Sequence, residues 1–210
     1  MADEYALHKA VRKGNITDVE RLINMGYDVN KQHFKFGETP LHKTLLYSSD
    51  IISEEIVDSI CAIIELLIKR GADINKPNMR GDTPLHDAII YNSPDIVIEL
   101  LIKRGADVNI SDKYGYTPLL CEIGRHRLTN IVELLIKAGA DINKPNRRGE
   151  TPLHYAIRCN YPNIIGLIIK SGADINIPNR RGDMLKKYFS FHEKSTFLLI
   201  CNVCQRQTTN

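Results

Sequence analysis

Apolar residues recur along this chain with helical spacing, in pairs of short segments separated by polar turns. In residues 82–109, the first segment places Leu85, Ala88 and Ile89 on one face, which predicts an amphipathic helix. A second helix is predicted directly after it. The positions that we expect it to turn toward the neighbouring helices are Ile96, Val97, Leu100 and Leu101. The pattern therefore predicts helical pairs.

The residues between these segments predict where each helix begins and ends. Thr83 precedes Pro84, so its hydroxyl is expected to cap the first helix while proline takes the first position, where no N–H is needed. Ser93 and Pro94 repeat this order and are expected to open the second helix. Gly105 is expected to end it, because glycine adopts the left-handed conformation easily. The polar stretch ADVNISDKYGY should then cross to the next pair as an extended hairpin.

The same phrase returns at a fixed interval. Gly81, Gly115 and Gly149 are 34 residues apart, whereas Leu41 and Leu85 are 44 apart, so one repeat carries an insertion of ten residues. A period of this length is typical of a stacked solenoid, in which a single repeat cannot bury its apolar face alone. The repeated phrase is therefore predicted to be a structural module.

The phrase T-P-L-H followed one residue later by Ala or Thr, at 39–44, 83–88 and 151–156, resembles the ankyrin repeat, as does IVELLIKAGADIN at 131–143. The resemblance implies an all-α solenoid of helix-turn-helix units with β-hairpin-like fingers, forming a single domain over 1–210. The expected repeats are 3–30, 34–78 with the insertion near 47–57, 79–111, 112–145 and 146–179, followed by a degenerate C-terminal cap at 180–210. The first of these lacks the T-P-L-H phrase, as a terminal repeat can.

Composition narrows the class of protein. The chain is 43% hydrophobic and 25% charged, it has no run of about 18 apolar residues, and its start is acidic and polar, so we expect an intracellular, cytoplasmic protein without a membrane span. Its five cysteines are expected to be reduced. No catalytic triad order, phosphate loop, paired carboxylates or HExxH helix occurs, so neither an enzyme nor a cofactor is expected.

The histidines of the repeated phrase could suggest a metal site. His42, His86 and His154 recur once per repeat, which places them along the stack rather than around one point. In ankyrin proteins, which the chain resembles, this imidazole hydrogen-bonds to neighbouring backbone, and we expect that role here in preference to zinc. Leu120 stands at this position in the fourth repeat, where we expect only a local contact to be weakened.

Two segments depart from the repeat. Ser53 and the acidic residues after it predict a long second helix with an acidic tip, opposite the fingers, within the insertion at 45–64. We favour a tolerated loop over a docking feature there. In the tail, Cys201 and Cys204 form a lone CxxC. A terminal cap is the simplest interpretation, while metal or redox chemistry and a docking motif remain alternatives.

Function is therefore expected on the concave surface made by the fingers and the first helices. The finger tips predicted to bind a partner are Lys35, Phe36, Met79, Arg80, Lys113, Tyr114, Arg147, Arg148, Arg180 and Arg181. On the exposed side of the first helices the corresponding positions are Tyr47, Tyr91, Arg125 and Arg158. Tyrosine and arginine are enriched at interface hot spots.

This row of cations and aromatic rings predicts the chemistry of the partner. Residues 1–105 carry 13 Lys/Arg and 16 Asp/Glu, and residues 106–210 carry 15 and 9, so the second half is basic. We expect a monomer that binds an acidic protein segment with apolar anchors, rather than a small molecule or a membrane. Nucleic acid is the alternative, and the carboxylates beside the tips, such as Glu38, Asp82 and Glu150, argue against it. The repeats also resemble ankyrin proteins of giant viruses and intracellular bacteria, which implies a host protein as partner and an adaptor role.

Overall fold

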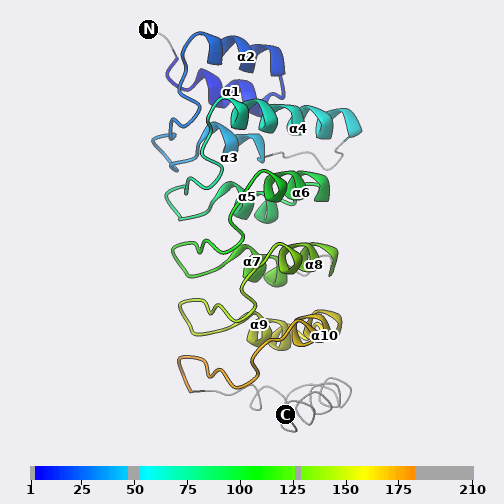
Figure 1. Cartoon of the computed structure of the whole chain (residues 1–210). Helices are drawn as coiled ribbons and strands as arrows, with labels where there is room; N and C mark the ends of the chain where they lie inside the picture. The colour runs from blue at the N-terminus through cyan, green and yellow to red at the C-terminus, as the bar shows by residue number, and fades with distance from the viewer. Residues whose placement is uncertain (1–2, 47–52, 126–128, 183–210) are drawn as a thin grey trace. The chain divides into compact units, whose positions relative to one another are not determined.

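The structure is a computed structural model that describes residues 3–46, 53–125 and 129–182. These residues form ten α-helices and no β-strand, which confirms the all-α fold expected from the sequence (Figure 1). The first helices of the successive pairs are α1 (Ala6–Arg12), α3 (Pro40–Thr44), α5 (Pro84–Ile90), α7 (Pro118–Gly124) and α9 (Pro152–Arg158). The second helices are α2 (Ile16–Asn24), α4 (Glu54–Lys69), α6 (Asp95–Lys103), α8 (Thr129–Lys137) and α10 (Pro162–Lys170).

Threonine and proline open α3, α5, α7 and α9, as the sequence predicts. The Thr83 hydroxyl accepts a hydrogen bond from the backbone N–H of His86 at 3.5 Å, and Pro84 is the first helical residue. The backbone N–H of Thr83 donates in turn to Nδ1 of His86 at 3.2 Å. Histidine thus takes the place that glutamate usually has in a capping box, and two N–H groups at the start of the helix are satisfied reciprocally.

The predicted start of α6 is wrong by one residue. Pro94 is the cap residue and makes no side-chain capping bond, and the helix begins at Asp95. Ser93 is not available as the cap, because its backbone N–H donates to the carbonyl of Ala88 at 2.8 Å and closes the turn after α5. The buried face of α6 differs accordingly. It consists of Val97, Ile98 and Leu101, whereas Ile96, predicted to be inside, is 57% exposed.

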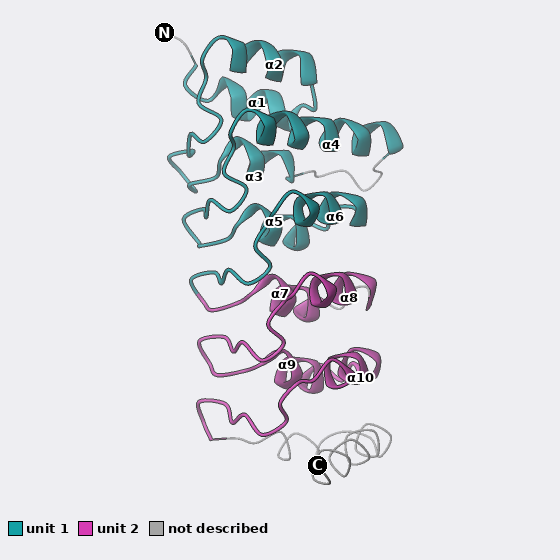
Figure 2. Ribbon diagram, viewed as in Figure 1, with its two compact units in different colours: residues 1–113 teal, residues 114–210 magenta. Residues whose placement is uncertain are grey.

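The chain divides into two compact units, an N-terminal unit of residues 1–113 and a C-terminal unit of residues 114–210 (Figure 2). In the N-terminal unit, α3 lies at the centre of the layer of first helices, between α1 and α5. The second helices α2, α4 and α6 pack against these and against one another in the same order. Leu41, Leu85 and Leu101 are completely buried there. Each such side chain contributes roughly 2 kcal/mol through its removal from water.

The C-terminal unit repeats this packing. Helix α7 contacts α8 and α9, α9 contacts α10, and α8 contacts α10. Leu119, Leu135 and Leu153 are completely buried within it. The extent of the predicted repeats, including the cap at 180–210, and the single domain over 1–210 stay predictions.

Helix α4 is the longest helix of the described residues, as the insertion predicts. It has 16 residues, against nine in α6. The Ser53 hydroxyl accepts from the backbone N–H of Ile56 at 3.4 Å, and Glu54 and Glu55 lie in the first turn, where the helix dipole favours negative charge. Figure 1 shows that α4 extends beyond α3 on the side away from the fingers. Residues 47–52, the first part of the insertion, lie outside the described residues.

Repeated asparagines join the turns of neighbouring repeats. In the N-terminal unit, Asn30 Oδ1 accepts from the backbone N–H of Asp73 at 2.7 Å, and Asn30 Nδ2 donates to the carbonyl of Gly71 at 2.8 Å. Asn75 Oδ1 accepts in the same way from Asp107 at 2.8 Å. Each amide therefore satisfies backbone groups that the next turn leaves without a partner of its own.

Candidate partner-binding surface

The fingers are the loops that lead from each second helix to the next first helix, and an asparagine shapes their tips. Asn146 Oδ1 accepts from the backbone N–H groups of Arg148 at 2.8 Å and Glu150 at 3.1 Å, and the Asn146 N–H donates to the Glu150 carbonyl at 3.0 Å. Asn78 holds Arg80 and Asp82 with the same bonds. The tips are hydrogen-bonded turns rather than strands, so the hairpin-like expectation applies to their path only.

Neighbouring tips are held in register by one backbone hydrogen bond each. In the N-terminal unit, the N–H of Met79 donates to the carbonyl of Phe36 at 2.9 Å. In the C-terminal unit, the N–H of Arg180 donates to the carbonyl of Arg148 at 3.1 Å. Gly149 permits this approach, because it has φ +75° and a Cβ there would lie 2.6 Å from the Arg180 nitrogen.

The His42 side chain is a fixed structural link. The Thr39 N–H donates to His42 Nδ1 at 3.1 Å, so the ring proton is on Nε2, which donates to the carbonyl of Asp82 at 3.1 Å. Burial lowers the pKa of His42 to about 4, so the ring is neutral at pH 7. The backbone role implied by the resemblance is thus confirmed at this position. At Leu120 the leucine is buried and Thr117 still caps the helix at 3.3 Å.

Predicted partner-binding residues of the N-terminal unit gather around one hollow, which we call the apolar cavity. Its volume is about 310 Å³, and its lining is Phe36, Glu38, Asn78, Met79, Arg80 and Tyr91. Phe36 and Met79 are each about half exposed, at 51% and 53%. Lys35 adds a cation, since its Nζ lies 5.1 Å from the centre of the Phe36 ring. Lys113 is exposed at the next tip but does not line the cavity, and Tyr47 lies outside the described residues.

Three buried acidic residues, Glu38, Asp82 and Asp87, lie at or next to the lining of the apolar cavity. Glu38 forms an ion pair with Lys43, and Asp82 forms one with the Nε of Arg80 at 2.9 Å. Asp87 is 1% exposed, and neither of its carboxyl oxygens has a hydrogen-bond partner among the described residues. Burial raises the pKa of Asp87 to about 8, with the negative charge of Asp82 as the next cause. Asp87 is therefore mostly a neutral acid at pH 7, which the sequence pattern did not indicate.

Predicted residues of the C-terminal unit gather around a second and larger hollow, the arginine cavity. Its volume is about 550 Å³, and its lining is Arg147, Arg148, Glu150, Arg158, Asn179, Arg180 and Arg181. Tyr114 and Arg125 were predicted with these residues and are exposed, but they do not line the cavity. The sequence therefore identified all five arginines, but not that they surround one space.

Arg158 is already engaged within the protein. Its guanidinium forms an ion pair with the buried Glu150 and lies 4.3 Å from the centre of the Tyr155 ring. Glu150 also accepts a hydrogen bond from the side chain of Asn146 at 3.1 Å. By contrast, Arg147, Arg148, Arg180 and Arg181 are exposed and form no ion pair within the described residues.

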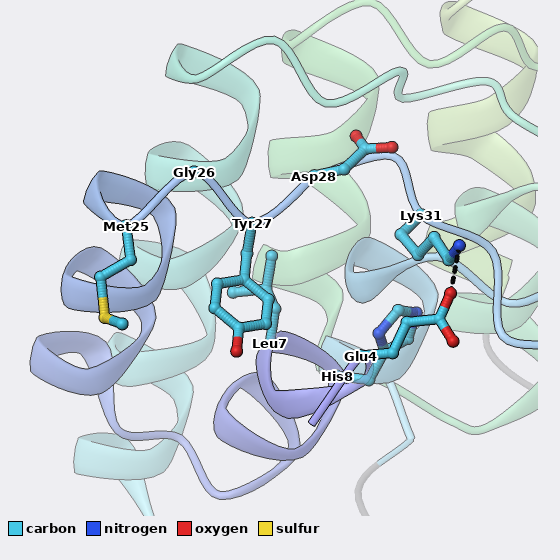
Figure 3. A pocket seen from close by; sticks show the side chains of 8 residues that line it. All are labelled: Glu4, Leu7, His8, Met25, Gly26, Tyr27, Asp28 and Lys31. Carbon is cyan, nitrogen blue, oxygen red and sulfur yellow. Dashed lines mark ion pairs between the residues drawn. The ribbon is translucent and has the colours of Figure 1, made fainter. Parts of the chain in front are cut away.

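A third hollow lies against the first repeat, as Figure 3 shows. Its volume is about 430 Å³, and its lining includes Leu7, Met25 and Tyr27, with an ion pair of 2.5 Å between Glu4 and Lys31 at one side. None of the predicted partner-binding residues lines it. In the first finger, Phe34 was not among the predicted binding residues, although it is 71% exposed. Its aromatic character, next to Lys35 and Phe36, was a signal available in the sequence.

The described residues contain no group of three or more His, Cys, Asp or Glu residues that could hold a metal ion. No described helix is long and apolar enough to cross a membrane. The CxxC of Cys201 and Cys204 and the tail predicted as cap or docking motif lie outside the described residues.

Comparison with known proteins gives several partial relatives. Rabankyrin-5 of Homo sapiens is 37% identical over 84 residues, which are 40% of this chain and 7% of that protein. The putative ankyrin repeat protein FPV240 of fowlpox virus (strain NVSL) is 37% identical over 75 residues, 36% of this chain and 16% of the relative. The 2-5A-dependent ribonuclease of Mus musculus is 34% identical over 82 residues, which are 39% of this chain and 10% of that protein. The matched part is thus a small fraction of each relative.

A family model described as "Ankyrin repeats (3 copies)" matches residues 7–112, 57–146 and 98–179. These overlapping matches span all ten helices of the described residues except Ala6, the first residue of α1. Ankyrin repeats generally mediate protein–protein interaction and are generally not catalytic. The chain belongs to the ankyrin-repeat family.

Proposed function

We propose that this chain is a non-catalytic protein-binding module that holds an acidic segment of a partner protein against its fingers and first helices. The observation that carries the proposal is the arginine cavity, where four exposed guanidinium groups have no ion-pair partner within the described residues. Clustered like charges repel one another, and a bound anion relieves that repulsion. Guanidinium forks match carboxylates with two parallel hydrogen bonds.

The apolar cavity supports the second part of the proposal. Phe36, Met79 and Tyr91 offer exposed apolar area beside Lys35 and Arg80. Such a surface suits a leucine, phenylalanine or methionine that is flanked by acidic residues. The partner that we propose is a host-cell protein, because the repeats resemble those of giant viruses and intracellular bacteria, and the role would be that of an adaptor.

Nucleic acid is the competing ligand. In the sequence, the acidic residues beside the tips argue against it, but a different feature does so in the folded chain. Glu38, Asp82 and Glu150 are buried and paired, so they do not repel a polyanion at the surface as their positions in the sequence suggest. What argues against nucleic acid is the lining of the arginine cavity, which contains no aromatic residue on which a base could stack. The ring of Tyr155 is covered by Arg158.

Affinity capture from cell lysate, followed by binding of the purified candidate, tests the proposal. In the test variant, Arg147, Arg148, Arg180 and Arg181 are all changed to Gln. In the control variant, the same change is made at the last residues of the second helices, which are the exposed Lys69, Lys103, Lys137 and Lys170. Both variants lose four positive charges.

The proposal requires a protein that the wild type and the control bind and that the arginine variant loses, with circular dichroism unchanged. If the control loses the same proteins, binding depends on net charge alone. If the arginine variant retains every protein, the fingers are a solvated rim, and the insertion at 45–64 becomes the next candidate.

A further inference from the structure

The arginine cavity has a shortage of negative charge that its own residues do not correct. Of the seven lining residues, five are arginines and one, Glu150, is acidic. The pairing of Glu150 with Arg158 leaves four positive charges around about 550 Å³ of open space. Cavities of this size are typical of sites for small ligands and side chains.

The backbone N–H groups of the four arginines are already used within the fingers. The backbone N–H of Arg148 donates to Asn146 Oδ1 at 2.8 Å, and that of Arg181 donates to Asn179 Oδ1 at 2.9 Å. The N–H groups of Arg147 and Arg180 donate to carbonyl groups of the preceding finger at 3.0 and 3.1 Å. These arginines can therefore hold an anion only through their guanidinium groups, each of which offers five N–H donors in a fixed plane.

The two tips cannot move apart freely. The backbone hydrogen bond from Arg180 to Arg148 joins them. Gly149 lies so close to the Arg180 nitrogen that a side chain at position 149 would not fit. The four unpaired guanidinium groups thus come from two adjacent tips in a fixed register. Because the backbone of these tips is already ordered, anion binding has to order only the arginine side chains, which lowers its entropic cost.

Phosphate matches this arrangement better than carboxylate. A carboxylate carries one negative charge and two oxygens, so four of them would be needed to balance the cavity. A phosphorylated serine or threonine carries about −1.5 to −2 charge at pH 7 and three strong acceptor oxygens. Two phosphoryl groups, one for each arginine pair, therefore balance the four charges in less space.

We infer that the arginine cavity binds a doubly phosphorylated segment of a partner protein, with its two phosphoryl groups between Arg147, Arg148, Arg180 and Arg181. This inference rests on the proposed function and deepens it, because it replaces an acidic segment in general by a phosphorylated one at this cavity. Binding would then depend on the phosphorylation state of the partner.

Fluorescence anisotropy with three labelled peptides tests the inference. The probe is Gly-Ala-pSer-Ala-pSer-Ala-Gly, and the two comparison peptides carry Glu or unmodified Ser at both phosphoserine positions. The test variant is Arg148→Gln/Arg181→Gln, and the matched control is Lys137→Gln/Lys170→Gln, at exposed ends of α8 and α10. Inorganic phosphate and a single-stranded oligothymidylate of equal charge serve as competitors.

We expect the phosphopeptide to bind at least about tenfold more tightly than the Glu peptide, since each phosphoryl group adds charge-assisted hydrogen bonds. The arginine variant should lose about tenfold or more of this affinity, while the control stays within about twofold. Millimolar inorganic phosphate should compete weakly, because it lacks the second linked phosphoryl group.

Other outcomes overturn the inference. Equal binding of the Glu peptide and the phosphopeptide means recognition of carboxylates, so the proposed function survives and the phosphate inference falls. Tighter binding of the oligothymidylate, lost steeply with salt, indicates a nucleic-acid site and overturns both. If inorganic phosphate binds as tightly as the peptide, the cavity is a site for the free anion. A lack of binding by all three peptides and both competitors also contradicts it.

Discussion

The third and fifth repeats differ in how they pair the acid that follows the finger glycine. In the N-terminal unit, the acid after the finger glycine is Asp82, and the arginine of its own tip, Arg80, pairs with it at 2.9 Å. In the C-terminal unit the corresponding acid is Glu150, and its partner is Arg158 from the end of α9. Tip residue Arg148, the counterpart of Arg80, is thereby left without an ion pair in the described part of the chain.

Two substitutions account for this difference. Glutamate is one methylene longer than aspartate, and position 158 is arginine where the third repeat has Ile90. The tip arginines of the two repeats therefore differ in whether they are paired inside the protein. Arg80 neutralises a buried carboxylate, whereas Arg148 is available to a ligand. A basic residue at a finger tip is thus no evidence of binding until its pairing inside the protein is known.

The largest effect is expected from Gly149→Val, which should break the register of the arginine tips. The valine would need φ +75° and would place its Cβ 2.6 Å from the Arg180 nitrogen, so we expect a loss of about 3 kcal/mol or more. Thermal denaturation by circular dichroism measures it. Gly172→Val is the control, since Gly172 has φ +93° and no described atom within 4 Å of its Cβ position. Equal effects of both changes would mean that the close approach at Gly149 is unimportant.

The next effect is a pH dependence that belongs to the N-terminal unit. Because the folded pKa of Asp87 is about 8 and the ordinary value is 3.8, the folded state binds the proton more tightly. Asp87 therefore leaves stability unaffected below about pH 4 and reduces it as pH rises toward 8, by on the order of 5 kcal/mol.

Asp87→Asn should remove this pH dependence and make the variant more stable than the wild type near pH 8. Urea denaturation at pH 5, 6, 7 and 8 measures the slope. Asp58→Asn, on the exposed side of α4, should leave the slope as it is in the wild type. Buried His42, with its lowered pKa, makes stability rise between about pH 4 and 6.5 in both proteins, so the difference between them is the quantity to compare. A stability difference between Asp87→Asn and the wild type that does not grow from pH 5 to 8 would contradict the assignment of a neutral Asp87.

A smaller effect is expected when the C-terminal unit is made to resemble the N-terminal one. Arg158→Ile leaves Glu150 without its helix partner, and we expect Arg148 to take over the pair as Arg80 does at Asp82. The partly exposed position limits the expected destabilisation to about 1–2 kcal/mol. Binding of the phosphopeptide should fall by about threefold or more, because one of the four available guanidinium groups is lost.

Urea denaturation and anisotropy together measure the result of Arg158→Ile. The exposed Arg125 provides a control, since Arg125→Ile should change stability by less than about 0.5 kcal/mol. An unchanged affinity for the phosphopeptide in Arg158→Ile would show that the pairing of Arg158 does not decide what Arg148 can bind.

The smallest effect is expected from Met79→Arg, which gives the third repeat the arginine pair of the fifth. In a background with Arg148→Gln and Arg181→Gln, it should raise phosphopeptide affinity by less than about twofold, because Arg80 stays paired with Asp82. Anisotropy measures the change. A full recovery of binding would mean that two tip arginines suffice and that the difference in ion pairs between the units is irrelevant.

The sequence was sufficient for the features that depend on local chemistry. The threonine caps, the prolines after them, the length of α4 and the glycine at each finger follow from hydrogen-bonding and backbone preferences within a few residues. The start of α6 was misjudged because Pro94 adopts φ −54° and ψ 147°, outside the helical region, while Ser93 N–H closes the preceding turn. A helix that begins at Pro94 and a helix that begins at Asp95 fit the sequence equally well.

The cavities are formed by contacts that cannot be deduced from the spacing of residues in the sequence. Arg158 and Glu150 are eight residues apart, and nothing in their spacing distinguishes this pair from Arg148 beside Glu150. Similarly, Asp87 occupies the helix position that Lys43 has in the second repeat. Its pKa is raised by burial in the folded chain and then by the charges of Asp82 and Glu38, which its sequence position does not show. Which exposed residues share one cavity follows from the stacking of repeats.

The asparagine bonds between turns have a consequence for how such a chain can change its length. The bond from Asp73 to Asn30 crosses the repeat with ten extra residues and measures 2.7 Å, and the bond from Asp107 to Asn75 crosses a repeat without them and measures 2.8 Å. Helix α4 of the longer repeat extends on the side away from the fingers, and the bond at the joint is the same in both repeats. A gene duplication that adds one whole repeat would copy both the asparagine and the turn that it joins. A duplication out of phase with the 34-residue period would separate each asparagine from the turn whose N–H it accepts.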